Sequence, residues 1–149
     1  MEWILKKFEE LSVYELYAIL QLRNEVFIIE QNCVYPDLDN KDQLSYHLMC
    51  WQNNKLIAYT RLLPPGIEYE NPAIGRVVTS PAVRKSGIGK ELMKQSIDCT
   101  DSLFGKKSIT LSAQLYLKKF YESLQFTTTG KVYLVDGIEH IKMIRNASK

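Results

Sequence analysis

One stretch of the chain, residues 77–90, has the residue types and spacing of an anion-binding turn. Its sequence, VVTSPAVRKSGIGK, runs from a valine-rich strand through a glycine-containing turn into a helix. The first amides of a helix have no intrahelical acceptor, and together with the helix dipole they bind anions such as phosphates. Gly87 and Gly89 let the backbone approach a ligand closely. Three cationic side chains add positive charge to the turn: Arg84, Lys85 and Lys90.

Two other phosphate-binding motifs do not match this stretch. It lacks the GK[ST] ending of a Walker loop, and its G-x-G-x-x-G dinucleotide fingerprint is incomplete. A turn that only caps the following helix is the alternative interpretation.

The elements that must position this turn follow from hydrophobic periodicity. Ser12 and Glu15 form an S-x-x-E capping box that begins a helix extending to about residue 31. The apolar run 26–29 indicates that this helix bends or ends there, and the Pro, Asn and Asp residues of 32–42 predict a loop. The expected strands are residues 3–8, 44–51, 55–63, 73–80, 107–113, 127–135 and 138–144, and the later helices are 87–103 and 115–124.

This order, β-α-β-β-β-α-β-α-β-β, predicts an α/β (mixed α+β) fold. We expect a mixed, mostly antiparallel sheet of about seven strands, flanked by helices. The length of 149 residues fits a single domain covering residues 1–149.

The charge of the chain is nearly balanced but unevenly distributed. The net charge of +2 gives no indication of a nucleic-acid partner. Residues 1–70 hold 6 basic and 11 acidic side chains, whereas residues 71–149 hold 13 basic and 6 acidic. This asymmetry suggests an anionic ligand on the second half and a cationic one on the first, with random surface variation as the alternative.

Three cysteines, Cys33, Cys50 and Cys99, have neither a CxxC pairing nor histidines at ligand spacing, so we expect no metal site. Their odd number and wide spacing are typical of a reducing compartment. The N-terminus lacks a signal-peptide pattern and no apolar run reaches bilayer length, so we expect a cytoplasmic protein without a membrane partner.

Several separated motifs together resemble one enzyme family. Pro81-x-x-Arg84-x-x-Gly87-x-Gly89, after a valine-rich strand, resembles the acetyl-CoA-binding motif of the GNAT N-acetyltransferase superfamily. Residues 114–126, QLYLKKFYESLQF, are similar to its N-x-x-A-x-x-x-Y-x-x-x-G-F pattern, with Gln114 in place of Asn and Gln125 in place of Gly. A narrower resemblance is to the ElaA-like branch of this superfamily. The residues that carry it are 22–31 (LRNEVFIIEQ), Asp39, Asp42, His47-Leu48, 74–77 (IGRV) and Tyr133-x-x-Asp136-Gly137-Ile138-x-His140-x-x-Met143.

The resemblance implies a GNAT fold with a splayed cofactor strand and acetyl-CoA as cosubstrate. The pyrophosphate would bind the amides of residues 85–90, and the pantetheine arm would pair along residues 77–79. The amide of Val78 would be an oxyanion donor that polarises the thioester carbonyl. The implied cofactor-binding residues are Val77, Val78, Thr79, Arg84, Lys85, Ser86, Gly87, Ile88, Gly89, Lys90, Gln114 and Tyr121.

Tyr121 resembles the general acid of the family, which protonates the departing thiolate. A thiol with a pKa of roughly 8.5 can take a proton from a phenol near 10 at little cost. Periodicity alone favours a core tyrosine at this position.

Residues that could serve the acceptor amine are more scattered. Glu30 and His47 are candidate bases, with an exposed helix-end carboxylate and a structural histidine as the respective alternatives. Arg76 and His140 are candidate acceptor contacts, although such an arginine more often forms a buried structural pair. The acidic loop of Asp37, Asp39 and Asp42 is expected near the acceptor entrance.

The leading hypothesis is an acyltransferase that moves acetyl from acetyl-CoA to a primary amine by direct attack in a ternary complex. Direct attack is favoured because no cysteine lies in an activating motif. The acceptor would be a small-molecule or peptide amine, and the protein a monomer or homodimer. Two alternatives remain: an acetyl-CoA-binding sensor or partner module with little catalysis, and acyl transfer in homoserine-lactone synthesis, against which the intact R-x-x-G-x-G turn argues.

Overall fold

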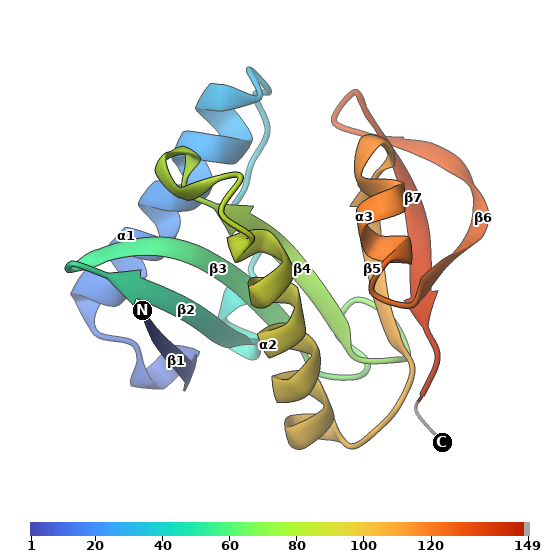
Figure 1. Cartoon of the computed structure of the whole chain (residues 1–149), viewed down its shortest axis with the longest axis horizontal. Helices are drawn as coiled ribbons and strands as arrows, with labels where there is room; N and C mark the ends of the chain where they lie inside the picture. The colour runs from blue at the N-terminus through green and yellow to red at the C-terminus, as the bar shows by residue number, and fades with distance from the viewer. Residues whose placement is uncertain (148–149) are drawn as a thin grey trace.

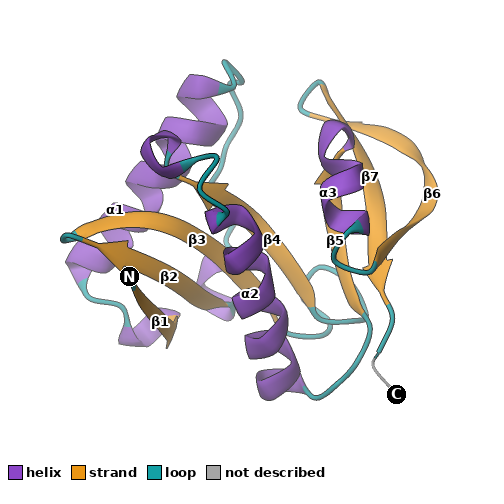
Figure 2. Cartoon of the chain, viewed as in Figure 1, coloured by secondary structure: helices purple, strands orange, loops and turns teal. Residues whose placement is uncertain are grey.

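A computed structural model describes residues 1–147 as one sheet flanked by helices (Figures 1 and 2). The seven strands have the spatial order β1-β2-β3-β4-β5-β7-β6, and every neighbouring pair except β4–β5 is antiparallel. The mixed, mostly antiparallel sheet expected from the sequence is confirmed. The strands are β1 (Glu2–Lys7), β2 (Tyr46–Gln52), β3 (Lys55–Leu63), β4 (Ala73–Thr79), β5 (Ile109–Gln114), β6 (Phe126–Val135) and β7 (Ile138–Arg145).

The sheet opens between β4 and β5. These parallel strands share a single registered pair, Ala73 with Thr110, and then diverge. Figure 1 shows the resulting V-shaped separation between β4 and the β5–β7–β6 half of the sheet. From Ile74 onward, the edge of β4 that faces β5 therefore has no strand partner.

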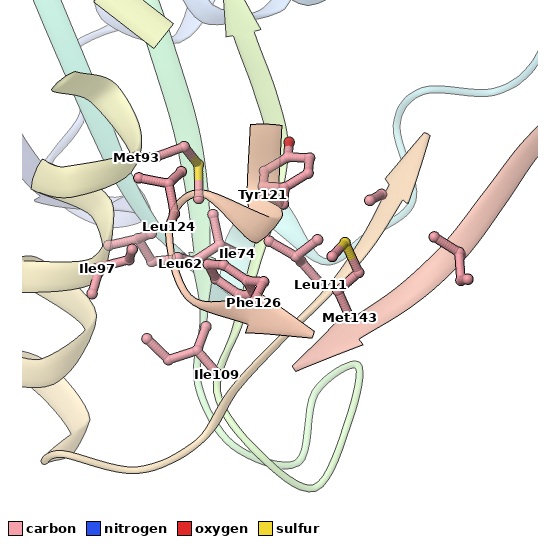
Figure 3. Close-up of a cluster of buried hydrophobic side chains, with 12 residues drawn as sticks. Leu62, Ile74, Met93, Ile97, Ile109, Leu111, Tyr121, Leu124, Phe126 and Met143 are labelled. Atoms are coloured by element: carbon pink, nitrogen blue, oxygen red, sulfur yellow. The ribbon is translucent and has the colours of Figure 1, made fainter. Parts of the chain in front are cut away.

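Helices cover both faces of the sheet. The helix α1 (Val13–Arg23) packs Ile19 and Leu22 on Met49 and Tyr59, whereas α2 (Ile88–Phe104) packs Ile88 and Leu92 on Leu48, Cys50 and Ala58 of the opposite face. The short α3 (Lys118–Glu122) covers β5 and β7 and shares a core with α2 (Figure 3). No helix within residues 1–147 is long and apolar enough to cross a membrane.

The first helix follows the sequence prediction closely. Ser12 Oγ accepts from the Glu15 amide at 3.0 Å, and the Glu15 carboxylate accepts from the Ser12 amide at 2.8 Å, which confirms the capping box. The helix continues past Arg23 as a π-helix, Asn24–Glu30, where the sequence indicated a bend or an end. The chain then enters the loop that was expected over residues 32–42.

The helix after β5 is shorter than the sequence predicted. Residues 115–124 were expected to be one helix, but they divide into a 3-10 turn, Leu115–Leu117, and the five residues of α3. Gln125, which replaces the usual glycine, takes the left-handed conformation itself, with φ 75°. The turn into β6 therefore forms without glycine, at the strain cost that a side chain carries in this region.

Candidate active site

A cavity of about 720 Å³ lies where β4 and β5 diverge. Six consecutive residues of β4, 74–79, line one wall, and Leu111, Ser112 and Gln114 of β5 line the other. The end of the π-helix with the following loop and the β6–β7 turn close two further sides, and α3 with its preceding turn closes the last. This volume is in the range of ligand-binding cavities.

The turn that the sequence predicts to bind phosphate contributes two residues to the wall of this cavity. Gly87 is the N-cap of α2 with φ 85°, a conformation that glycine adopts without strain. The first helical bond is donated by Glu91 to Gly87 O, which leaves the amides of residues 88–90 without an intrahelical acceptor. Arg84 and Gly89 line the cavity, and a Cβ on Gly89 would meet only Phe120 Cζ, at 3.9 Å.

The cofactor strand expected from the sequence is kinked at Arg76. The β3–β4 register shifts between Tyr59 and Arg61, and Arg76 takes φ 50°, so the strand carries a bulge there. Val77, Val78 and Thr79 follow this bulge along the cavity wall. Because β5 has already diverged, a ligand with an extended amide-bearing arm can pair with this edge.

Tyr121 lies between the hydrophobic core and the cavity. Its ring packs edge-on against Phe120 and Phe126, and its side chain is buried, yet it also lines the cavity. Figure 3 shows its hydroxyl pointing away from the surrounding core side chains. Burial raises the pKa of this phenol, so Tyr121 carries its proton at neutral pH. Proton donation from Tyr121 consequently costs more than donation from a free phenol.

Two contacts cross the cavity between segments that are distant in sequence. Gln114 Nε2 donates to Gln31 Oε1 at 3.4 Å, which links the end of β5 to the end of the π-helix. The Cys33 thiol donates to the Asp136 backbone oxygen at 3.3 Å, which links the loop to the β6–β7 turn. The sequence does not predict that Cys33 lines the cavity, because no local motif marks this cysteine.

Glu30 lines the cavity as expected for a candidate base, but its carboxylate is paired. Arg84 Nη1 donates to Glu30 Oε2 at 2.8 Å, and Arg84 Nη2 lies 2.7 Å from Glu30 Oε1. Arg84 Nη2 also donates to Thr79 O at 3.3 Å. The ion pair thus joins the turn before α2 to the end of the π-helix.

His140 lies on the cavity wall between two neighbouring strands. It is registered with Gln114 on one side and with Tyr133 on the other, and its ring stacks on the Tyr133 ring at 6.2 Å. Its Nδ1 is 2.8 Å from Ile138 O, and a carbonyl only accepts, so Nδ1 carries the proton. In the neutral ring, Nε2 is then the nitrogen with the free lone pair, which a base requires.

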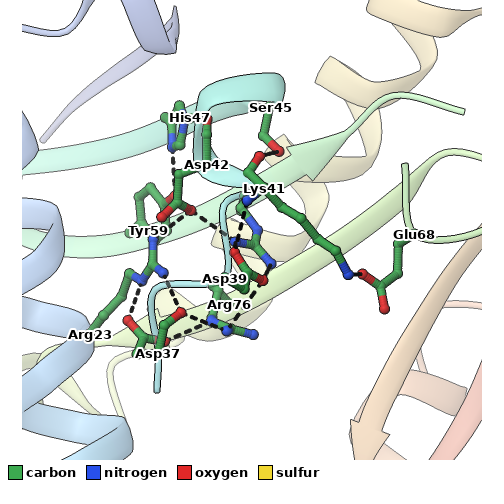
Figure 4. Close-up of polar contacts among 11 residues, drawn as sticks. Arg23, Asp37, Asp39, Lys41, Asp42, Ser45, His47, Tyr59, Glu68 and Arg76 are labelled. Carbon is green, nitrogen blue, oxygen red and sulfur yellow. Dashed lines mark hydrogen bonds and ion pairs between the residues drawn. The ribbon is translucent and has the colours of Figure 1, made fainter. Parts of the chain in front are cut away.

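His47, the other candidate base, is buried and does not line the cavity. Figure 4 shows it beside Asp42. Its Nε2 donates to Asp42 O at 2.9 Å, which leaves Nδ1 to accept from the Tyr59 hydroxyl at 2.6 Å. Burial lowers the pKa of His47, so the ring stays neutral with both nitrogens engaged. The expectation of His47 as a base is corrected, because the ring has no access to a substrate.

Arg76 is held in a network of charged side chains beneath the loop (Figure 4). Arg76 Nε donates to Asp37 Oδ1 at 2.8 Å and Nη2 to Asp37 O at 2.9 Å. Buried Arg23 bonds Asp37 and Asp42, and Arg61 bonds Asp39 and Asp42, with the shortest contact of each pair at 2.8 Å. Residues 33, 35 and 36 of the loop line the cavity, whereas Asp37, Asp39 and Asp42 do not, and their carboxylates bind these guanidiniums.

The comparisons with known proteins agree with this geometry. Residues 11–146 match the model of the acetyltransferase (GNAT) domain. The chain belongs to the GNAT acetyltransferase family. It is 41% identical to the protein ElaA of Escherichia coli over 97% of this chain and 96% of that protein, and it is thus an ElaA-like member of the GNAT family.

Solved structures of acyltransferases have the same fold as this chain. An acyl-CoA N-acyltransferase from Pseudomonas aeruginosa is 41% identical, with a TM-score of 0.92 over 97% of this chain and 99% of that chain. The crystal structure of E. coli ElaA is 40% identical, with a TM-score of 0.92 over 98% of this chain and 100% of that chain. The acyl-homoserine lactone synthase BjaI, at 15% identity, a TM-score of 0.78 and coverage of 97% and 82%, shares the fold alone. This GNAT protein is therefore an acyltransferase.

Proposed function

We propose that this GNAT acyltransferase transfers acetyl from acetyl-CoA to a primary amine by direct attack in a ternary complex. The observation that carries the proposal is the unpaired edge of β4 beyond Ala73, which runs from the phosphate-binding turn toward Tyr121. That layout matches a cosubstrate with a pyrophosphate at one end, an extended amide arm and a thioester. Acetyl-CoA, when bound, would supply the acetyl group as an activated thioester.

Residues of three elements would hold the cosubstrate. The amides at the start of α2, with Arg84, Lys85 and Lys90, would bind the pyrophosphate. Lys85, at φ 66°, keeps a strained conformation of the kind that clusters at ligand-binding turns. Val77 and Thr79 would pair with the pantetheine arm along the open edge of β4. The Val78 amide, expected from the sequence as the oxyanion donor, points to the other edge, because Val78 is registered with Tyr59 and Ser80 N donates to Ile57 O in the same β3–β4 ladder, so this expectation is corrected.

The proton route uses groups on opposite walls of the cavity. His140 Nε2, or Glu30 once Arg84 has turned to the phosphates, would take the proton of the acceptor ammonium. Tyr121 would donate its hydroxyl proton to the sulfur as the amine nitrogen bonds to the acetyl carbon and the carbon–sulfur bond breaks. Burial keeps this proton on Tyr121 until the thiolate forms.

The test is thiol release from acetyl-CoA across a panel of primary amines, comparing the wild type with Tyr121→Phe. Loss of a general acid should lower kcat by about 100- to 10,000-fold. Coenzyme A affinity, measured by calorimetry, should stay within about twofold, because only the hydroxyl is removed. Tyr17→Phe, which removes a hydroxyl from an exposed position of α1, is the matched control and should match the wild type.

Two results would count against the proposal. Equal rates for Tyr121→Phe and the wild type would remove Tyr121 from its role. Binding of acetyl-CoA without turnover of any amine would favour a sensor or partner module instead.

A further inference from the structure

The cations that line the cavity are already neutralised by protein carboxylates. Within residues 1–147, the cavity wall has two such side chains, Arg76 and Arg84. Arg76 is fixed by Asp37 and also lies 3.5 Å from Asp39 Oδ2. Arg84 is paired with Glu30 and belongs to the turn that would bind phosphate. Both guanidiniums already hold a protein carboxylate, and Arg76 therefore fits the alternative of a structural ion pair better than the expected acceptor contact.

The carboxylates that line the cavity, in contrast, either lack an ion-pair partner or would lose it when phosphates bind. Asp136 in the β6–β7 turn makes no ion pair with another residue of the described chain. Glu30 would lose its partner as soon as phosphates recruited Arg84. With a cosubstrate in place, the acceptor side would therefore present negative charge on two of its walls.

Between these carboxylates the walls are largely apolar. Phe27 from the π-helix, Tyr35 from the loop, Ile74 from β4, and Val135 and Ile138 from the hairpin line the same cavity.

The loop and the hairpin turn are also joined to each other. The Cys33 thiol contacts the Asp136 backbone oxygen at 3.3 Å, so the loop and the hairpin turn meet on one side of the cavity. A side closed in this way favours a compact acceptor over a peptide.

From these observations we infer that the acceptor is a small primary amine with an aromatic or branched aliphatic body and no carboxylate. The inference rests on the proposed amine acetylation and narrows its substrate class. The ammonium group would approach Glu30, Asp136 and His140, and the apolar body would pack on the wall of Phe27, Tyr35 and Ile138. A carboxylate on the acceptor would meet like charge and no free cation.

The experiment compares amines that share a skeleton. Phenethylamine carries the amine and the ring, L-phenylalanine adds a carboxylate, L-phenylalaninamide replaces that carboxylate with a neutral group, and ethylamine lacks the ring. We expect kcat/KM for L-phenylalanine to be at least about 100-fold below that for phenethylamine, because an unpaired charge is desolvated. The amide should stay within about tenfold of phenethylamine, and ethylamine should fall about 30-fold or more below it through lost apolar contact.

A binding measurement tests the inference without turnover, and a variant tests it through KM. Calorimetry on the protein saturated with coenzyme A should detect phenethylamine and not L-phenylalanine at the same concentration. Asp136→Asn should raise KM for phenethylamine about five- to tenfold while leaving coenzyme A affinity unchanged, since removing one charge partner weakens only the cation.

Each outcome has a definite meaning. Equal or better use of L-phenylalanine, or a marked preference for Phe-Gly-Gly amide over phenethylamine, would overturn the inference while leaving amine acetylation intact. Failure of every amine in the panel, with acetyl-CoA bound, would refute the proposed function and this inference together.

Discussion

Removal of the Glu30 carboxylate is expected to strengthen coenzyme A binding, although Glu30 lines the cavity. Glu30 and Arg84 form a two-point ion pair with contacts of 2.8 and 2.7 Å. Phosphates at the start of α2 would draw the same guanidinium away, so cofactor binding has to break this pair. In Glu30→Gln the competing negative charge is gone and Arg84 is available from the start.

The size of the effect follows from the exposure of the pair. The Arg84 and Glu30 side chains are 38% and 39% exposed, so the pair is a surface salt bridge. Such pairs contribute about 0.2–1 kcal/mol. Since 1.4 kcal/mol corresponds to a tenfold change in affinity, the Kd for coenzyme A should fall by up to about fivefold.

Titration calorimetry at low and at high salt measures this change. Glu25→Gln is the matched control, because it removes an exposed carboxylate from the same π-helix that makes no ion pair within the described chain. The difference between Glu30→Gln and the wild type should shrink at high salt, where exposed charges are screened. An unchanged or weaker affinity in Glu30→Gln would refute the reasoning, since it would mean that Glu30 holds Arg84 in place for the phosphates.

The remaining predictions concern the charged network and the cavity cysteine. Asp42→Asn removes the negative charge between the buried guanidiniums of Arg23 and Arg61, so the free energy of unfolding in urea should fall by about 3–5 kcal/mol. The control Asp98→Asn, at an exposed position, should change it little. A decrease below about 1 kcal/mol for Asp42→Asn would contradict this prediction. Burial raises the pKa of Asp42, but the hydrogen bonds from Arg23 and Arg61 outweigh it and the net pKa is lowered. The stability contributed by Asp42 is therefore present above about pH 4 and lost as pH falls further, and the variant should flatten this dependence in acid unfolding. Cys33→Ser should keep thiol release within about threefold of the wild type, and a loss of 100-fold or more would indicate an acyl-cysteine route instead of direct attack.

The features that the sequence predicted well depend on neighbouring residues. The capping box of Ser12 and Glu15, the glycine N-cap at Gly87 and the turn at Asp136-Gly137 are local, and their conformations are set within four residues. The strand pattern then followed from alternation and turn signals. These elements were sufficient to predict the sheet.

The contacts that define the candidate site are not local, and no pattern in the sequence indicates them. Glu30 and Arg84 are 54 residues apart, Asp37 and Arg76 are 39 apart, and Cys33 and Asp136 are 103 apart. His47 illustrates the consequence, because a histidine in a strand after an acidic loop is equally compatible with a base and with a buried structural role. Packing against Tyr59 and the Asp42 carbonyl decides between the two, and only the fold brings these groups together.

Contacts between residues distant in sequence also change the interpretation of the charge asymmetry between the two halves of the chain. Residues 1–70 hold 11 acidic side chains against 6 basic, which suggested an acidic surface for a cationic acceptor. Three of those acids, Asp37, Asp39 and Asp42, are bound to Arg23, Arg61 and Arg76, so they order the loop from within and present no charge to a ligand. The negative charge that an amine would meet comes from Glu30 in one half and Asp136 in the other, because the fold brings the π-helix and the last hairpin to opposite sides of one cavity. For the proposed amine acceptor, recognition would depend on these two carboxylates, and neutralising either one should affect it more than removing any exposed acid elsewhere in the first half.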